Sequence, residues 1–266
     1  HECSELVRGG TREITLLGQN VNSYGLDGEG DGLSFARLLE EICRIPELKR
    51  VRFTTSHPKD LAPEVIAAFE RFPNLCPALH LPLQSGSNSV LKRMGRRYTK
   101  EKYLDLVRRL RQTRADMVLS TDIIVGFPGE TEADFSQTLD LVREVAFDSS
   151  FSFKYSDRPG VRAASFADKV PEEIKGFRLD LLQREQDGLT ERSLQNLVGT
   201  TRECLVEGRS LKPGTPDQTL WKGREPGGRI VNFSGPARDL TGELIPVTIT
   251  QAKKHSVFGE VGKSYD

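Results

Sequence analysis

Five short polar segments with the residue types of a small-ligand site each follow an apolar run of the sequence. Glycine permits close approach of the backbone to a ligand, and amides with hydroxyls suit a zwitterionic ligand that carries a ribose. One such segment is typical of an ordinary turn, whereas five on one edge of a sheet predict a ligand site. The segments are Gly18-Gln19-Asn20, Thr55-Ser56-His57-Pro58, Gln84-Ser85-Gly86-Ser87, Gly126-Phe127-Pro128-Gly129-Glu130 and Tyr155-Ser156-Asp157-Arg158-Pro159-Gly160.

Three further features of the sequence bear on the chemistry. His57 has neither a carboxylate neighbour nor metal-ligand spacing, which favours a hydrogen-bonding role over general acid or base catalysis. Asp122 lies inside an apolar run, where burial of an unpaired carboxylate is costly, so it must pair with a donor or reach solvent. Arg96 and Arg97 are typical of surface residues, although one of the two could instead bind a ligand carboxylate.

The elements that must position these residues alternate between two periodicities. Short β-branched runs predict strands, and the segments between them carry apolar residues at helical spacing. This alternation predicts an α/β fold with a parallel sheet, in which ligands bind beyond the carboxyl ends of the strands. Because the first ten residues read as the end of a helix at Gly9-Gly10, we expect an incomplete barrel without its first strand. The expected strands are Glu13–Leu17, Arg50–Thr55, Ala78–Leu83, Val118–Phe127 and Ser150–Tyr155.

A second domain is expected after a long helix that spans about residues 171–197. Beyond Gly199, glycine, proline and threonine increase and the helical periodicity ends. Five short strands separated by turn residues then predict a small antiparallel barrel of the oligonucleotide-binding kind. The expected domains are therefore residues 1–199 and residues 200–266. The expected strands of the second are Thr201–Glu207, Thr219–Lys222, Arg229–Phe233, Leu244–Thr250 and Ser256–Val261.

Composition restricts the classes of function. Lys and Arg number 38, as do Asp and Glu, so the chain has no overall charge that attracts nucleic acid. Residues 200–266 carry ten basic and eight acidic side chains, a small excess that permits a polyanionic partner. No apolar run is long enough for a membrane helix, and the cytoplasm is the expected location. The four cysteines are widely separated, which favours free thiols over a metal site.

Five motifs, in order along the chain, resemble those of the radical S-adenosylmethionine methylthiotransferases. Within that family, Thr54-Thr55-Ser56-His57-Pro58 together with Gly228-Arg229-Ile230-Val231-Asn232-Phe233 resembles the MiaB branch, and the segment from Gly199 resembles a TRAM domain. The five motifs are Leu17-Gly18-Gln19-Asn20-Val21-Asn22, Phe53-Thr54-Thr55-Ser56-His57-Pro58, His80-Leu81-Pro82-Leu83-Gln84-Ser85-Gly86-Ser87, Met94-Gly95-Arg96-Arg97-Tyr98-Thr99 and Asp122-Ile123-Ile124-Val125-Gly126-Phe127-Pro128-Gly129-Glu130-Thr131.

The resemblance implies a partial radical SAM barrel, similar to part of a TIM barrel, followed by a TRAM barrel. It implies methylthiolation of N6-isopentenyladenosine at C2, next to the tRNA anticodon, with S-adenosylmethionine, two four-iron four-sulfur clusters and an electron donor. Neither the three-cysteine loop of such enzymes nor their N-terminal domain is present in the sequence. We therefore expect a fragment that is itself inactive, with no metal ligand and no catalytic residue among its side chains. The residues that the resemblance implies for S-adenosylmethionine are Gln19, Asn20, Ser56, His57, Gln84, Ser85, Arg96, Gly126 and Phe127.

RNA contacts are expected mainly in the second domain. There the cations Lys222, Arg224 and Arg229 would neutralise phosphates, or else form ion pairs within the protein. The aromatic residues Trp221 and Phe233 would stack on bases, or else form the core of the barrel. Arg158 of the first domain joins the same set of candidates. Three other functions compete: an RNA-binding module with an α/β scaffold, a methylthiotransferase for another substrate such as a ribosomal protein, and an unrelated α/β-barrel enzyme.

Overall fold

The first domain is built around five parallel strands. The structure, a computed structural model, describes residues 1–25, 32–54, 56–210 and 219–262. Every strand pairing in this domain is parallel, as the alternation of strand and helix predicts. The sequence-based prediction of a partial parallel barrel is thus confirmed in its strands. These are β1 (Glu13–Leu16), β2 (Arg50–Phe53), β3 (Ala78–His80), β4 (Val118–Val125) and β5 (Ser149–Lys154).

The five strands form two sheets, β1-β2 and β3-β4-β5. Between them, a single parallel bridge joins Val51 of β2 to Leu75, and the Ser56 amide donates to the carbonyl oxygen of His80 at 3.3 Å. The strands therefore follow one another in chain order around an open, curved surface. Their carboxyl ends share one edge, which brings the five polar segments together as expected.

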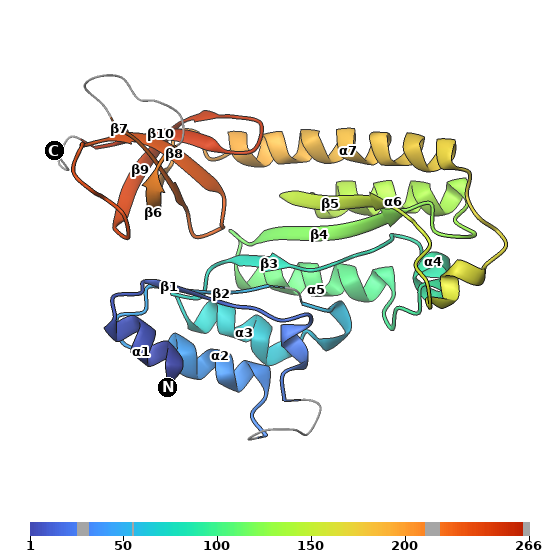
Figure 1. Ribbon diagram of the computed structural model, residues 1–266, viewed down its shortest axis with the longest axis horizontal. Helices are drawn as coiled ribbons and strands as arrows, with labels where there is room; N and C mark the ends of the chain where they lie inside the picture. Colours follow the sequence, from blue (N-terminus) through green and yellow to red (C-terminus); the bar gives the residue numbers. More distant parts are fainter. Residues whose placement is uncertain (26–31, 55, 211–218, 263–266) are drawn as a thin grey trace.

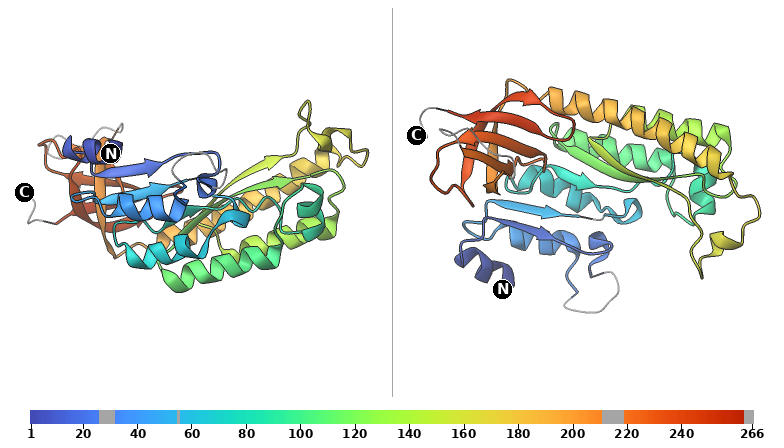
Figure 2. Two further views of the ribbon diagram at one scale, coloured as in Figure 1. Left: turned by 90° about the horizontal axis from the view of Figure 1, so that it is seen from below. Right: turned by 45° about the horizontal axis from the view of Figure 1, so that its top comes forward.

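Helices cover the outer face of the strands (Figure 1; Figure 2, left). Alternate residues of β4 point outward into this layer, and among them Thr121, Ile123 and Val125 are buried. The main core lies between the strands and these helices. The helices are α1 (Glu2–Arg8), α2 (Phe35–Cys43), α3 (Pro63–Arg71), α4 (Asn88–Arg93), α5 (Lys100–Thr113), α6 (Glu132–Val145) and α7 (Glu172–Gln195), with short 3₁₀ helices at Val21–Ser23, Pro58–Asp60 and Arg162–Ser165.

Local signals explain where several helices begin. Helix α6 opens with a capping box, in which the Thr131 hydroxyl accepts from the Asp134 amide and the Asp134 carboxylate accepts from the Thr131 amide. Ser34 and Thr99 cap α2 and α5 in the simpler way, and Pro63 is the first residue of α3. The start of α6 therefore follows directly from its sequence.

The second domain is a closed barrel of five strands in the order β10-β8-β7-β6-β9. Four of its pairings are antiparallel, but β10 pairs with β8 in parallel. The expectation of a wholly antiparallel barrel is wrong in this one pair, because a closed ring with an odd number of strands cannot alternate direction throughout. The strands are β6 (Thr201–Arg209), β7 (Thr219–Arg224), β8 (Ile230–Gly235), β9 (Leu244–Ala252) and β10 (Val257–Val261).

Trp221 and Phe233 fill the interior of this small barrel. Both side chains are fully buried, and they are cross-strand partners on β7 and β8. Trp221 Nε1 donates to the carbonyl oxygen of Pro236 at 3.0 Å, which satisfies its polar group. Their expected stacking on RNA bases is therefore wrong, because neither ring has a free face, and the core role is the one that the structure shows.

Helix α7 joins the two domains. It packs along β5 and α6 and runs toward the small barrel, which lies at the end of the first domain where the strands begin (Figure 1; Figure 2, right). The expected boundary between residues 199 and 200 falls in the segment between α7 and β6. The small barrel thus lies at the amino ends of the parallel strands, opposite the edge that carries the polar segments.

Candidate functional site

The segments after β1 and β2 are joined through Asn20. Its side-chain oxygen accepts from the His57 amide at 3.2 Å, and its amide nitrogen donates to Asp60 at 2.8 Å. Ser56 is buried and donates to Asn22 Oδ1 at 2.9 Å, so its hydroxyl holds the loop together. Gln19, by contrast, is exposed. The structure thus brings Asn20 and His57 together. Ser56 is buried next to them and stabilises the loop through its hydrogen bond to Asn22.

His57 connects this corner to Arg96. The imidazole Nε2 lies 3.3 Å from Arg96 Nη1, and Nδ1 accepts from the Lys59 amide at 3.2 Å. Partial burial, and then the Arg96 charge, lower the pKa of His57 below its usual value, so the ring is neutral at neutral pH. A neutral imidazole has one acceptor nitrogen, so it cannot accept from Lys59 and Arg96 together. Arg96 therefore keeps hydrogen-bonding capacity for another partner.

Gln84 and Ser85 follow β3, but they have different roles. Gln84 adopts a left-handed backbone conformation with φ of 68° and bridges to Ile123, which turns the chain at the edge of the sheet. Ser85 is fully buried, and its hydroxyl accepts from the Ser87 amide at 3.2 Å and lies 3.4 Å from Thr138 Oγ1. Ser85 is therefore a structural residue of the loop, which corrects its expected contact with a ligand.

The loop after β4 is held by a buried ion pair. The Gly126 amide donates to Glu130 Oε2 at 2.6 Å, and Arg178 of α7 donates to the same oxygen at 2.8 Å. Burial raises the pKa of Glu130, while the Gly126 amide and Arg178 oppose this effect. At Gly126 the backbone has φ of 70°, and a Cβ would lie 2.3 Å from Lys175 Cγ. Glu130 thus holds the loop against α7.

A cavity of about 420 Å³ opens at this edge, between the carboxyl ends of β3, β4 and β5. We call it the rim cavity. Its walls include four residues of the predicted ligand-binding and RNA-binding sets, Gln84, Arg96, Phe127 and Arg158. The Phe127 ring meets Tyr155 edge to face at 5.1 Å. The other lining residues are Met94, Ile124, Phe153, Lys154, Tyr155, Ser156, Val161 and Ala163.

A second group of polar residues lies on the concave inner face of the strands and consists of His80, Ser120 and Asp122; only Asp122 is a candidate from the sequence alone. His80 Nε2 lies 3.3 Å from Asp122 Oδ2 and the Asp122 side chain is 31% exposed, so this carboxylate has both a neighbouring ring nitrogen and contact with solvent. His80 Nδ1 lies 3.0 Å from Ser120 Oγ, its cross-strand partner. The alternation of β3 and β4 is the signal that finds these residues, since Ser120 and Asp122 share one face.

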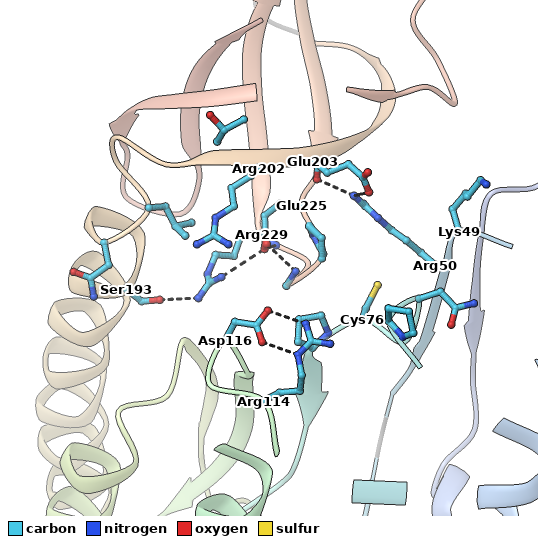
Figure 3. Close-up of a pocket in the computed structure, with 18 residues that line it drawn as sticks. Lys49, Arg50, Cys76, Arg114, Asp116, Ser193, Arg202, Glu203, Glu225 and Arg229 are labelled. Carbon is cyan, nitrogen blue, oxygen red and sulfur yellow. Dashed lines mark hydrogen bonds and ion pairs between the residues drawn. The ribbon is translucent and has the colours of Figure 1, made fainter. Parts of the chain in front are cut away.

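The junction between the domains is held by two arginines of β2. Arg50 donates to the carbonyl oxygens of Arg224 and Glu203, each at 2.8 Å. Arg52 donates to Pro226 and Glu225 carbonyl oxygens at 2.8 and 3.0 Å and pairs with Glu13. Figure 3 shows Arg50 reaching from the first domain to Glu203 of the barrel. Neither arginine was expected to have this role, because its partners lie more than 150 residues away in the sequence.

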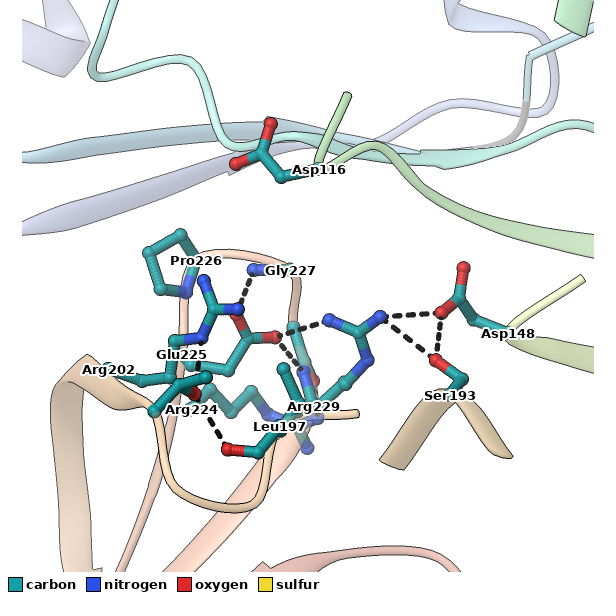
Figure 4. A network of polar contacts seen from close by, with 12 residues as sticks. Asp116, Asp148, Ser193, Leu197, Arg202, Arg224, Glu225, Pro226, Gly227 and Arg229 are labelled. Atoms are coloured by element: carbon teal, nitrogen blue, oxygen red, sulfur yellow. Dashed lines mark hydrogen bonds and ion pairs between the residues drawn. The ribbon is translucent and has the colours of Figure 1, made fainter. Parts of the chain in front are cut away.

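Arg229 belongs to the same junction rather than to a free RNA-binding surface. Its Nη2 contacts Asp148 at 2.5 Å and Ser193 at 3.1 Å, and Nη1 lies 3.6 Å from Glu225 (Figure 4). The side chain is only 19% exposed. Its expected phosphate contact is therefore corrected, because two carboxylates from different domains already neutralise the guanidinium. For this cation, the structure therefore supports the alternative of ion pairing.

Lys222 and Arg224 remain on the surface of the small barrel. Both pair with one carboxylate, Glu207, at 3.4 and 2.7 Å. Two cations that share one anion leave a net positive charge, and each side chain is about 40% exposed. Arg158 lies at the opposite end of the first domain, at the rim cavity, so the structure does not group it with these two residues.

The cysteines do not form a metal site. Among residues 1–25, 32–54, 56–210 and 219–262, no group of three or more His, Cys, Asp or Glu side chains is arranged to hold a metal ion. The four thiols are free, and burial raises the pKa of Cys43 and Cys204 to about 12 and that of Cys76 to about 11. None of the described residues is therefore assigned to an iron–sulfur cluster.

Comparison with known families settles the class of the first domain. The family model for the radical SAM superfamily matches residues 1–142, more than half of the sequence. This chain belongs to the radical SAM superfamily. A TRAM domain model matches residues 195–261 of this radical SAM chain, which coincides with the closed barrel. The family implies S-adenosylmethionine and four-iron four-sulfur chemistry.

Similar proteins confirm the resemblance to methylthiotransferases. A tRNA-2-methylthio-N(6)-dimethylallyladenosine synthase of Nitratidesulfovibrio vulgaris is 55% identical over 97% of the radical SAM chain. Proteins with the same name from Oleidesulfovibrio alaskensis and Geobacter metallireducens are 53% and 50% identical over 97% and 98% of the chain. The chain spans 58%, 59% and 57% of the length of these three relatives.

A solved structure supports the fold alone. Coproporphyrinogen III oxidase from Escherichia coli, a radical SAM enzyme, superposes with a TM-score of 0.51 at 17% identity. The superposition covers 85% of the radical SAM chain and 58% of that protein. In the described part of the chain, no helix is both long and apolar enough to cross a membrane.

Proposed function

We propose that this chain is the core of a tRNA methylthiotransferase that modifies N6-dimethylallyladenosine at C2. The observation that carries the proposal is the 55% identity, over 97% of the chain, to a relative named for that reaction. The relatives are longer than the chain, so the reaction is assigned to the protein that the complete gene encodes. The electron donor, the second four-iron four-sulfur cluster and a cytoplasmic location belong to the same proposal.

The rim cavity fits S-adenosylmethionine in size and in chemistry. Its volume of about 420 Å³ lies within the usual range for small-ligand sites. Apolar walls at Phe127 and Met94 suit an adenine, and Arg96 provides a cation for a carboxylate. When bound beside a reduced cluster, S-adenosylmethionine supplies a 5′-deoxyadenosyl radical, the oxidant that this superfamily uses.

This chain's own residues then have defined roles. Arg96, with hydrogen-bonding capacity left by the neutral His57, would hold the methionine carboxylate. Asn20 and His57 would hold the loops after β1 and β2 together beside Arg96, and the exposed Gln19 would be free to contact the ligand. The Glu130–Arg178 pair would keep the Gly126–Phe127 turn in place against α7, so that the Phe127 ring faces the cavity.

The small barrel would bind the tRNA. Lys222 and Arg224 share Glu207 and keep a net positive charge on an exposed strand, which suits phosphate contacts without base discrimination. Arg50, Arg52 and Arg229 would set the orientation of that surface relative to the first domain. The tRNA would thus be held at a fixed orientation with respect to the rim cavity.

Expression of the complete gene in a bacterium that lacks its own enzyme tests this function. Mass spectrometry of digested tRNA should show 2-methylthio-N6-dimethylallyladenosine in place of N6-dimethylallyladenosine. A variant that lacks the TRAM segment should fail to restore the modification at equal protein level. Unmodified tRNA with a methylthiolated ribosomal protein would contradict the proposal and favour the other substrate class.

A further inference from the structure

The concave inner face of the first domain carries an uncovered aromatic surface. Phe151 and Phe153 of β5 are 60% and 54% exposed, although parallel strands are usually buried on both faces. They lie two residues apart on one strand, so both rings project from the same face. Exposed apolar surface of this kind marks a binding site more often than an ordinary solvent face.

A cavity of about 660 Å³ lies against this face and extends to the small barrel. We call it the inner-face cavity. One end is formed by Phe151, His80 and Ser120 of the strands. The other end is formed by Arg224, Gly227, Gly228, Arg229 and His255 of the barrel together with Asp148 of the first domain, with Arg52 between the two ends. The cavity therefore joins an aromatic end to a charged end across the domain junction, where Arg229 is paired with Asp148.

Three polar side chains, His80, Ser120 and Asp122, lie beside the aromatic end. The Ser120 hydroxyl lies 3.0 Å from His80 Nδ1, and His80 Nε2 lies 3.3 Å from Asp122 Oδ2. His80 itself meets Phe151 edge to face at 6.3 Å. The second carboxylate oxygen, Asp122 Oδ1, has no hydrogen bond to any residue that the structure describes, and the side chain is 31% exposed. It remains available as an acceptor beside the Phe151 ring.

The inner-face cavity also adjoins the rim cavity. Phe151 lines the first and Phe153 the second, and the two residues are one strand repeat apart, about 7 Å. A planar group on Phe151 would therefore lie next to the ligand of the rim cavity.

We propose that the inner-face cavity receives the purine nucleotide on which the enzyme acts, with the base stacked on Phe151 and its exocyclic N–H donated to Asp122. This inference rests on the proposed tRNA substrate and deepens it. The aromatic surface supplies stacking for any base, and the acceptor at its edge selects a base that carries an exocyclic amine, as adenine does. At the barrel end, Arg224 shares Glu207 with Lys222 and keeps part of its positive charge, so the sugar-phosphate backbone would lead from the cavity to these two side chains of the small barrel.

Binding of an anticodon stem-loop RNA that carries fluorescent 2-aminopurine, at the nucleotide following the anticodon, tests the proposal on the 266-residue chain. Stacking on Phe151 should quench the fluorophore when the RNA binds. Phe151→Leu should abolish the quenching and weaken binding about fivefold or more, because stacking of one base contributes roughly 1–3 kcal/mol. Asp122→Asn, of equal size, should weaken binding of the same stem-loop with adenosine at that position, measured by filter retention, because 2-aminopurine lacks the amine at C6.

A matched control is available on the outer surface. Phe177 of α7 is 61% exposed and lies outside the inner-face cavity, so Phe177→Leu should bind and quench like the wild type. Because Phe151 is as exposed as Phe177, its replacement should leave the melting temperature unchanged. Equal quenching and affinity in Phe151→Leu and Phe177→Leu would overturn the inference alone. Absence of RNA binding by the wild-type chain, measured by filter retention, would overturn the proposed function and the inference with it.

Discussion

Replacement of Arg229 by Met should destabilise the junction between the domains. The change removes the contacts with Asp148 and Ser193 and the nearby charge of Glu225, and it leaves two carboxylates without their cation. Their side chains are 14% and 4% exposed. Removal of one partner from a buried ion pair costs about 3–5 kcal/mol.

The structure places the expected cost of Arg229→Met at the lower end of that range. Asp148 still accepts from the Leu119 amide at 2.8 Å and from Ser193 at 2.5 Å, so it keeps part of its stabilisation. A loss of about 3 kcal/mol corresponds to a decrease in melting temperature of about 6–12 °C for a chain of this size. Lys222→Met, which removes a half-exposed ion pair of the same barrel, should change it by about 1–2 °C.

Two signals measure this change in the same sample. Trp221 is the single tryptophan and is buried in the small barrel, so its fluorescence reports that domain. Circular dichroism at the helix band reports the first domain, which holds the helices. Arg229→Met should lower the midpoints of both signals. If both midpoints stay within about 2 °C of the wild type, as expected for Lys222→Met, the junction role of Arg229 is refuted.

Three further predictions concern the thiols, the α6 cap and the RNA surface. At pH 8, Ellman's reagent should react with one thiol of the native chain, Cys3, and with four thiols after unfolding, because burial raises the pKa of Cys43, Cys76 and Cys204. Rapid reaction of two or more thiols in the native chain would contradict this prediction. Burial would raise the pKa of Asp134, but hydrogen bonds from Ser87, Thr131 and Ser89 outweigh it and lower the pKa to about 2. The stability that this carboxylate contributes is thus present above its ordinary pKa of about 3.9 and is lost as the pH falls toward 2. The urea midpoints of the wild type and of Asp134→Asn should therefore differ at pH 7 and converge near pH 2. In filter-binding titrations across a salt series, the double variant Lys222→Ala/Arg224→Ala should make the slope of log affinity for tRNA against log salt concentration shallower by about 1–2. Glu207→Gln should strengthen tRNA binding. An unchanged slope in the double variant would show that these two residues do not contact the RNA.

The sequence predicts the elements of this protein well because their signals are local. The five strands of the first domain and the five of the second begin within a residue or two of their expected positions, since periodicity and turn residues mark them. The pairing of Asp122 was also predictable, because a carboxylate within an apolar strand requires a partner. The parallel β10–β8 pair follows only when the closure of the barrel is considered.

The site was less predictable because it depends on contacts between distant segments. Ser85 carries the right hydroxyl in the right loop, yet packing against Thr138 buries it. Arg229 is one of several basic residues in the tail, and only the fold brings Asp148 to it. Phe151 looks like an ordinary strand residue until the open inner face of β5 is seen. The motifs therefore predict which edge of the sheet binds a ligand. Which of their side chains are accessible to a ligand depends on burial, and burial is known only from the structure.

The most direct test of the account is S-adenosylmethionine binding by the protein that the complete gene encodes, reconstituted with iron and sulfide without oxygen. Equilibrium dialysis would compare the wild type with Arg96→Met and with Arg97→Met, its exposed neighbour outside the rim cavity. A hydrogen bond between charged groups contributes about 1.5–3 kcal/mol, so Arg96→Met should bind at least about tenfold more weakly than the wild type. Arg97→Met should retain wild-type affinity. Equal affinity in all three proteins would contradict the assignment of the rim cavity to S-adenosylmethionine.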